Sequence, residues 1–368
     1  MRQDIFIGLM SGTSLDGIDA VAVRFTPECE LVASHAEAIP EHLKRQVLQL
    51  TQPGEKEIDL MGKVDIALGE LFAKTVNRLI AKAAINKRDI QAIGSHGQTI
   101  RHRPEFGFTL QIGDANIIAE KTGITTVADF RRRDMAASGQ GAPLVPAFHQ
   151  AMLQSKSHDR ALLNIGGMAN ITYLPKEGNG TVIGFDTGPG NILMDAWMHI
   201  HHGQSYDKDA QWASKGKTSP TLLTDLLSLA FFSEPPPKST GREQFHPGWL
   251  QNMLSNHPDL KAVDVQRTLL ELTARSITDC ITHYLPSSLT ELYVCGGGSR
   301  NPLLMQRLEQ LLPGINVQCS DALGINADWM EAAAFAWLAK QCMEGASGNI
   351  PSVTGAQNQR ILGAIYQA

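Results

Sequence analysis

The sequence predicts an α/β protein folded into two domains, with a ligand-binding cleft between them. Three observations lead to this prediction: the chain length, the alternation of strand-like and helix-like segments, and a similar opening in each half. With 368 residues the chain is longer than a single hydrophobic core usually serves. Its composition, 43% hydrophobic and 19% charged, is typical of globular proteins. Small ligands often bind between two such domains.

The first half opens with a strand, a glycine-containing turn and a second strand. Residues 5–10 form an apolar run typical of a buried strand, and residues 18–25 alternate small and β-branched side chains. The turn between them covers residues 11–17. A third strand over 31–39 would complete an antiparallel meander.

Helices and strands alternate after this opening. Apolar residues recur at helical spacing over residues 58–84, which predicts a long helix. A strand over 90–94 then leads to His96, and a short strand over 125–128 leads to Asp129.

The second half repeats the plan of the first. Residues 161–174 again predict a strand, a glycine turn and a strand, and another strand over 181–185 ends just before Asp186. The later segments are predicted as helices over 192–199, 265–284, 302–312 and 328–343, with a strand over 292–295.

These patterns set the expected domain boundaries. We expect one domain over 1–130 and a second over 131–349, and the tail 350–368 can pack on the first. The sequence contains no short-period repeat that would indicate a repeat architecture.

Charge and cysteine content exclude several classes of protein. The formal net charge of -5 offers no electrostatic attraction to nucleic acid, and the basic cluster Arg131–Arg133 is too short to change this. The five cysteines show no Cys-x-x-Cys spacing, which argues against a disulfide framework or a structural zinc site. Because no apolar run reaches membrane-spanning length and the N-terminus is too polar for a signal peptide, we expect a cytoplasmic protein with no membrane partner.

Common nucleotide-binding motifs are absent. Gly216-Lys217-Thr218 is not a Walker A motif, because Gln211 occupies the position of its first glycine. The glycines that begin at Gly188 do not form a dinucleotide fingerprint, since Leu193 stands where the third glycine belongs.

Three glycine-rich turns are expected instead, each at the end of a predicted strand. They contain Gly12–Gly17, Gly166–Gly167 and Gly296–Gly298. Such turns can direct backbone N–H groups at phosphate oxygens, and glycine lets a ligand approach the backbone closely. Taken alone the first turn reads as an ordinary hairpin. The three together favour a nucleotide site, with two turns for the phosphates and one for adenosine.

The first turn also offers side-chain donors and a metal ligand. Thr13 and Ser14 carry hydroxyl groups that can donate to phosphate oxygens. Asp16 is suited to hold Mg²⁺ through water, because magnesium prefers carboxylates together with retained waters.

The two strand–turn–strand openings and the late triple glycine resemble the actin, sugar kinase and Hsp70 superfamily, with its two actin/hexokinase-like (ribonuclease H-like) domains. Within that superfamily the sequence is similar to the anhydro-N-acetylmuramic acid kinase family over nearly the whole chain. The motifs that carry the similarity are Gly8–Gly17, Gly94–His102, Val127–Asp134, Gly139–Pro146, Asn164–Gly167, Gly184–Asn191, Lys238–Glu243 and Val294–Gly298.

The resemblance implies an ATP- and Mg²⁺-dependent kinase of peptidoglycan recycling. In the family's reaction ATP phosphorylates O6 of 1,6-anhydro-N-acetylmuramic acid while water opens the anhydro bridge, which gives N-acetylmuramic acid 6-phosphate and ADP. Asp186 resembles the family's catalytic aspartate, the base that activates the water. From the residues alone it reads equally as a helix-capping or turn aspartate. The implied partners are a small amino sugar and a second copy of the chain in a homodimer.

The resemblance also implies binding residues. The ATP-binding residues are Gly12, Thr13, Ser14, Leu15, Asp16, Gly17, Ile18, Asp19, Gly166, Gly167, Gly296, Gly297 and Gly298. The candidates for the sugar pocket are His96, Asp129 and Arg131, because arginine presents a planar fork to the lactyl carboxylate of the sugar. Which of the three consecutive arginines binds that carboxylate stays open. Asp195 either supports the metal or lies on a surface face.

Three other functions stay open at this point. A chaperone or cytoskeletal ATPase would hydrolyse ATP slowly without a sugar, and it would usually carry extra binding or assembly segments. A hydrolase of the same fold would act without ATP. A kinase for another sugar is disfavoured only by the resemblance.

Overall fold

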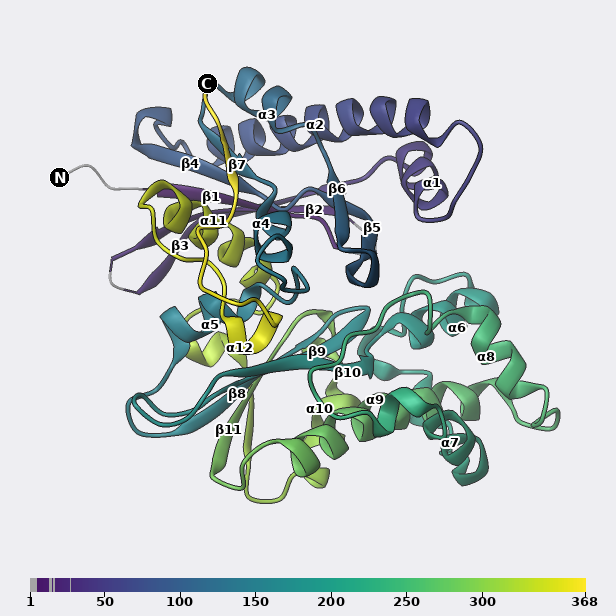
Figure 1. The fold of residues 1–368 in the computed structure, drawn as a ribbon. Coiled ribbons are helices and arrows are strands. Elements are labelled where there is room, and N and C mark those ends of the chain that lie inside the picture. The colour runs from purple at the N-terminus through teal and green to yellow at the C-terminus, as the bar shows by residue number, and fades with distance from the viewer. Residues whose placement is uncertain (1–4, 13–14, 16, 27) are drawn as a thin grey trace. The chain divides into compact units, whose positions relative to one another are not determined.

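The computed structural model describes residues 5–12, 15, 17–26 and 28–368, and Figure 1 shows their fold. The chain divides into two compact units, each with its own sheet. Unit 1 comprises Met1–Leu153 and Trp329–Ala368, and unit 2 comprises Gln154–Asp328.

These boundaries differ from the expected limits of 1–130 and 131–349. Residues 131–153 and 329–349 belong to unit 1, because helix α11 (Met330–Met343) packs on the first sheet and helix α5 (Val145–Leu153) packs on α11. Ten of the 14 residues of α11 are buried, so this helix is a core element with hardly any polar face. The tail also belongs to unit 1.

The sheet of unit 1 has six strands in the order β13-β7-β4-β1-β2-β3. Strand β1 pairs antiparallel with β2 and parallel with β4, while β2–β3 is antiparallel and β4–β7 is parallel. The strands are β1 (Ile5–Met10), β2 (Gly17–Phe25), β3 (Cys29–Ala38), β4 (Ile90–Ser95), β7 (Thr126–Ala128) and β13 (Ala364–Tyr366).

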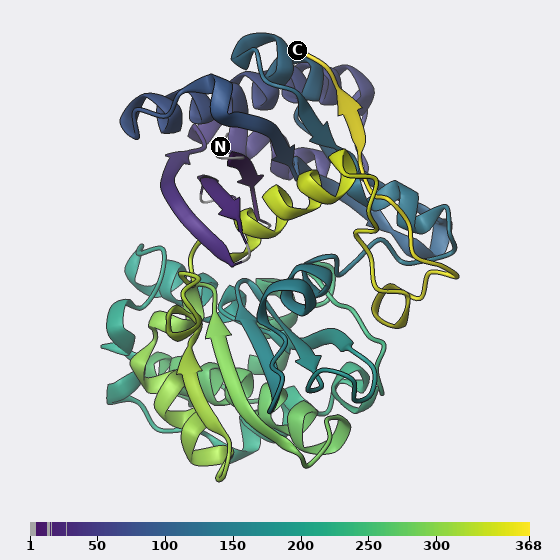
Figure 2. The same ribbon diagram turned by 90° about the vertical axis from the view of Figure 1, so that its left-hand side faces the viewer.

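Both faces of this sheet are covered. Ile7 and Leu9 of β1 pack in one hydrophobic cluster with residues of the long helix α2, and α11 crosses the other face (Figure 2). Gly8 and Gly94 allow that crossing, because a Cβ atom at either position would overlap a backbone carbonyl of α11. The remaining elements of unit 1 are α1 (Glu41–Leu50), α2 (Glu57–Lys82), the β5 (Gln98–Arg103) and β6 (Phe108–Ile112) hairpin, α3 (Ala115–Thr122), α4 (Phe130–Met135) and α12 (Pro351–Thr354).

Unit 2 is built around a five-stranded sheet in the order β10-β9-β8-β11-β12. Its strands are β8 (Asp159–Ile165), β9 (Met168–Leu174), β10 (Ile183–Pro189), β11 (Leu289–Cys295) and β12 (Asn316–Cys319). Its α-helices are α6 (Ile192–His202), α7 (Pro220–Leu227), α8 (Pro247–Leu254), α9 (Ala262–Tyr284) and α10 (Pro302–Leu311). Strand β10 runs past the predicted end at 185, so Asp186 lies within a strand.

The two sheets share one topology. In each, the first three strands form an antiparallel meander, and the fourth and fifth strands lie parallel to the first on its other side. The predicted α/β fold of two actin/hexokinase-like (ribonuclease H-like) domains is therefore confirmed, as is the repeated opening in the second half. Among the helices of the described residues, none combines the length and the hydropathy that crossing a membrane requires.

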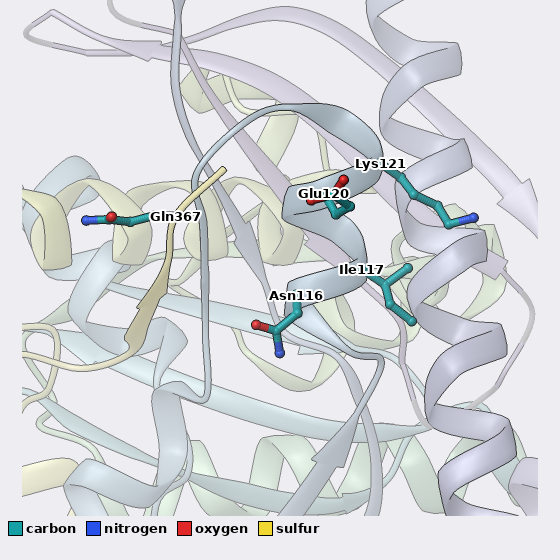
Figure 3. A pocket seen from close by; sticks show the side chains of 5 residues that line it. All are labelled: Asn116, Ile117, Glu120, Lys121 and Gln367. Carbon is teal, nitrogen blue, oxygen red and sulfur yellow. The ribbon is translucent and has the colours of Figure 1, made fainter.

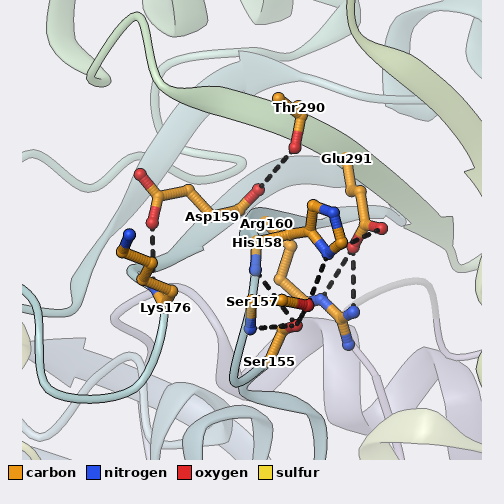
Figure 4. Close-up of polar contacts among 8 residues, drawn as sticks. All are labelled: Ser155, Ser157, His158, Asp159, Arg160, Lys176, Thr290 and Glu291. Atoms are coloured by element: carbon orange, nitrogen blue, oxygen red, sulfur yellow. Dashed lines mark hydrogen bonds and ion pairs between the residues drawn. The ribbon is translucent and has the colours of Figure 1, made fainter.

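A polar cluster ties together the amino-terminal ends of β8 and β11 (Figure 4). Asp159 accepts hydrogen bonds from the Lys176 backbone N–H at 2.7 Å and from the Tyr173 hydroxyl at 2.9 Å. Arg160 pairs with Glu291 at 2.8 Å. Because β8 and β11 are parallel, this cluster fixes one edge of the sheet and leaves the opposite edge, where both strands end, to the glycine turns.

Candidate active site

Three loops meet at the carboxyl ends of the strands of unit 2. Gly166 and Gly167 join β8 to β9, a second loop follows β10, and Gly296–Gly298 follow β11. The Gly190 N–H donates to the Gly167 carbonyl at 2.9 Å, and the Asn191 N–H donates to the Gly166 carbonyl at 2.8 Å. Backbone hydrogen bonds thus hold the first two loops together.

The triple glycine is held against the end of β8. Gly296 has a φ of +76°, and a Cβ atom there would lie 2.9 Å from the Ile165 carbonyl oxygen. A Cβ atom at Gly298 would lie 2.5 Å from the Ile165 Cβ. At Gly297, in contrast, the nearest atom would be 3.8 Å away, on Asn191. Two of the glycines are therefore needed for packing, and Gly297 leaves backbone open to a ligand.

Asp186 is bound on its strand by a distant segment of the chain. Its backbone N–H donates to the Lys238 carbonyl at 3.0 Å. Its carboxylate oxygen Oδ2 accepts hydrogen bonds from the Ser239 hydroxyl and the Thr240 N–H, each at 2.9 Å. Sequence analysis identified Lys238–Glu243 as a motif of the resemblance and missed this contact. The only signal in the sequence was a run of small polar residues after a proline-rich loop.

The environment of Asp186 makes its carboxyl group a stronger base than an ordinary aspartate. Burial, with a smaller contribution from the negative charge of Glu243, raises its pKa to about 6, although the hydrogen bonds from Thr240 and Ser239 act in the opposite direction. A carboxylate with a pKa near neutrality can accept a proton from water in a reaction and release it again, as a general base requires.

The turn between β1 and β2 in unit 1 is only partly described. Of the predicted nucleotide ligands, Thr13, Ser14 and Asp16 lie outside the described residues. Leu15 has a φ of +59° and its side chain is 2% exposed within the core, so it anchors the turn. Ser11 donates to the Gln98 side chain at 2.6 Å.

The flanking ligand candidates of this turn lie within or beside strand β2. Ile18 is fully buried, Gly17 begins the strand, and Asp19 lies opposite Met10 on β1. At Gly12, Gly17 and Ile18, only backbone groups are suited to contact a nucleotide.

His96 and Arg131 form a buried pair. The Arg131 Nη2 lies 2.8 Å from the His96 Nε2, and the Arg131 Nη1 donates to the Gly141 carbonyl at 2.9 Å. Burial, with help from the positive charge of Arg131, lowers the pKa of His96 to about 3, so the imidazole is neutral. Burial likewise lowers the pKa of Arg131 to about 10, which still leaves the guanidinium charged at pH 7.

The Gly141 peptide links Arg131 to a second buried group. Its N–H donates to the carboxylate of Asp134 at 2.8 Å, and Asp134 is fully buried. Asn349 and Thr354 also donate to this carboxylate, at 2.6 and 2.8 Å. The segment that carries Arg131 is therefore fastened to the tail of the chain.

Asp129 is separate from the buried pair of His96 and Arg131. It lies in the left-handed conformation before α4, with a φ of +59°, and its carboxylate pairs with Arg132 at 2.6 Å. Among the three consecutive arginines, Arg131 is thus the one next to His96, while Arg132 and Arg133 are exposed.

The described residues contain no cluster of side chains that matches the expected metal site. Within residues 5–12, 15, 17–26 and 28–368, no group of three or more His, Cys, Asp and Glu side chains is arranged to hold an ion. Asp195 lies in the first turn of α6, and Asp16 is outside the described part. The Mg²⁺ site therefore stays a prediction.

A shallow depression of about 390 Å³ on unit 1 contains none of the predicted site residues (Figure 3). Four residues of the α3 helix line it together with one residue of the tail: Asn116, Ile117, Glu120, Lys121 and Gln367.

The family model and the curated relatives that match this chain carry the same family name. The family model described as anhydro-N-acetylmuramic acid kinase matches residues 4–368. The anhydro-N-acetylmuramic acid kinase of Shewanella amazonensis is 52% identical over 371 residues, which cover 100% of both chains. That of Coxiella burnetii is 50% identical over 368 residues, which cover 100% of this chain and 98% of the relative. Component A of the (R)-2-hydroxyglutaryl-CoA dehydratase of Acidaminococcus fermentans has a TM-score of 0.46 at 10% identity, covering 90% and 95% of the two chains.

Proposed function

The chain belongs to the anhydro-N-acetylmuramic acid kinase family, and on that premise we propose that it converts 1,6-anhydro-N-acetylmuramic acid, ATP and water into N-acetylmuramic acid 6-phosphate and ADP. The observation that carries this proposal is the carboxylate of Asp186, which is held within strand β10 by hydrogen bonds from Ser239 and Thr240 and has a pKa raised to about 6. On the same premise we propose that the enzyme uses Mg²⁺ with ATP, that it is located in the cytoplasm and that its oligomeric state is a homodimer.

The chemistry of the substrate explains why such a base is needed. In this sugar O6 is tied to C1 in an acetal bridge, so O6 has no proton for a conventional kinase base to remove. The C1–O6 bond breaks as the phosphoryl group is transferred to O6, and positive charge develops at C1. Water must then attack C1 and lose a proton. In our proposal Asp186 accepts that proton.

The hydrogen bonds of Asp186 are compatible with this role. Both bonds from Ser239 and Thr240 reach Oδ2, and within the described part of the chain Oδ1 receives no hydrogen bond. One oxygen thus fixes the carboxylate while the other is available to a water molecule. A base held in one orientation loses less entropy when the reacting water binds.

Two further groups are proposed to bind the reactants. The open backbone at Gly297 and the glycine loops beside it fit the adenosine and phosphates of ATP. Arg131 uses three N–H groups on His96 and Gly141, and a guanidinium has five, so two stay free for the lactyl carboxylate of the sugar. Binding Mg²⁺ beside the phosphates would neutralise their charge.

Isotopic labelling tests this proposal. Turnover in ¹⁸O-water should place one label at C1 of the product and none in the phosphate ester, with detection by mass spectrometry fast enough to precede anomeric exchange. Asp186→Asn should lower kcat by roughly 10²- to 10⁴-fold and leave ATP affinity in place. Asp259→Asn, an exposed aspartate of the same unit, serves as the matched control and should keep full activity.

Three outcomes would contradict the proposal. Label in the phosphate ester would show that water attacks phosphorus instead of C1. Absence of label at C1 would remove water activation from the role of Asp186. Retention of more than about a tenth of the activity in Asp186→Asn would exclude it as the general base.

A further inference from the structure

Lys238 is a buried cation next to the proposed base. Lys238 is only 7% exposed, and a lysine is almost never buried so deeply unless its charge has a specific partner. The ammonium donates to the Phe231 carbonyl at 3.0 Å. It also lies 4.6 Å from the centre of the Phe231 ring and 5.7 Å from that of Tyr284. Two cation–π contacts and one charged hydrogen bond thus fix the end of this side chain.

The backbone that follows Lys238 holds Asp186. We use the name strap for residues Lys238–Thr240, whose carbonyl, hydroxyl and N–H groups bind the backbone and the carboxylate of Asp186. The far end of the strap is fastened as well, because the Thr240 hydroxyl donates to the Gln244 side chain at 2.6 Å. Lys238 is the only strap residue whose side chain is buried, so it supplies the anchor at the near end.

We infer that Lys238 is a positioning residue, which holds the strap against Asp186 and thereby keeps the carboxylate oriented and ionised for proton transfer. This inference deepens the proposed function and rests on it for the role of Asp186. Lys238 acts through the strap and not on the reacting atoms, because its ammonium lies against the rings of Phe231 and Tyr284.

Among the described residues, Glu243 is the charged side chain that shifts the pKa of Asp186. On β9 its direct partner is the neutral Asn170, and the short 3-10 helix η5 (Ala230–Ser233) contributes the uncharged Phe231. On α9 the titratable groups beside Lys238 are Tyr284, whose ring lies 5.7 Å away, and Cys280, whose pKa is raised by burial and lowered by Lys238. Downstream of the strap, Arg242 and Glu243 carry charge, and Glu243 repels the carboxylate of Asp186. The hydrogen bonds from the strap are therefore the main interactions that favour the charged form of Asp186.

Lys238→Met tests the anchor directly. Methionine has a similar length and fits between two aromatic rings, but it cannot donate to the Phe231 carbonyl. If the strap loosens, Asp186 loses hydrogen bonds to its charged form, and the acid limb of kcat/KM against pH should move up by about one pH unit. Ser239→Ala removes one bond and should move the limb by about half a unit in the same direction. Glu243→Gln removes a repelling charge and should move it to lower pH.

The combination of variants separates positioning from a general loss of structure. If Lys238 acts through the strap, Ser239→Ala should have little further effect in the Lys238→Met background, because coupled residues are not additive. Lys238→Arg keeps the charge, the donor and the ring contacts, and should restore most of kcat. The matched controls are Lys215→Met and Ser228→Ala, both exposed in unit 2, and both should leave the pH profile unchanged.

A second readout does not depend on turnover. Titration of ¹³C-carboxyl-labelled aspartate by NMR, with the Asp186 signal assigned from Asp186→Asn, should show the same shifts in the protein without substrate. If the wild type fails to phosphorylate the sugar, the proposed function is wrong, while this titration still decides the role of Lys238. An unchanged Asp186 titration in folded Lys238→Met, or fully additive shifts in the double variant, would overturn the inference.

Discussion

The charge of Asp186 is expected to destabilise the fold, so Asp186→Asn should be more stable than the wild type above pH 7. Burial raises the pKa of this carboxyl from 3.8 to about 6 in the folded protein. Between these two values the folded state binds more protons than the unfolded state. Stability therefore falls as pH rises through this window, and it stays low above pH 6.

The size of the effect follows from the two pKa values. A difference of about two pKa units, at about 1.4 kcal/mol per unit, sets an upper limit of about 3 kcal/mol. Asp186 is only partly buried, so solvent screening reduces the expected gain to about 1–2 kcal/mol. Asparagine keeps an oxygen that can accept the bonds from Ser239 and Thr240, so these contacts should survive the change.

Urea unfolding at pH 5 and pH 8 measures this gain, with hydrogen exchange in peptides of residues 168–189 reporting on unit 2 alone. At pH 5 much of the folded Asp186 is protonated, so the advantage of the variant should shrink by about half. Asp259→Asn should show no such dependence on pH. A variant that is less stable than the wild type at pH 8, or equally favoured at both pH values, would refute the reasoning.

Two other predictions concern the packing of the triple glycine and the hydrogen bonds of Asp134. Gly298→Ala should destabilise unit 2 by about 1–3 kcal/mol, because its methyl group would lie 2.5 Å from the Ile165 Cβ, whereas Gly297→Ala should keep full thermal stability and lose affinity for ATP in calorimetry. Equal stability of the two alanine variants would contradict this difference. Asp134→Asn should speed hydrogen exchange in residues 349–360, because the amide has one acceptor oxygen in place of two, so its N–H₂ must face either the Gly141 N–H or the donors of the tail, at a cost of about 1–3 kcal/mol. Unchanged exchange there would show that Asp134 does not hold the tail.

Local patterns predicted most of the elements. The meander at 5–39 and its repeat at 161–185 follow from alternating apolar residues and glycine turns, which act over a few positions. The long helix at 58–84 was found as α2, since helical periodicity needs no distant partner. Element ends moved by a few residues, as happens when a turn tightens or a strand continues into a loop.

Distant contacts could not be predicted in this way. The strap binds Asp186 across 53 residues of sequence, and nothing near either segment indicates the other. Similarly, α11 follows unit 2 in the chain but packs on β1, so sequence order placed it in the wrong domain. Asp129 and Arg131 are two positions apart, yet Asp129 pairs with Arg132 while Arg131 lies against His96. Such outcomes depend on tertiary packing, which periodicity does not encode.

The position of α11 also determines the order in which the protein can mature on the ribosome. The helix that covers one face of β1 and β4 ends about 190 residues after Leu153, with the whole of unit 2 in between. At translation rates of about 5–20 residues per second, the N-terminal strands wait roughly 10–40 s with that face uncovered. Unit 2 is continuous and can fold during this interval. Nascent chains are thus expected to bind chaperones through their first 153 residues. This N-terminal part of unit 1 should aggregate first when the protein is overproduced.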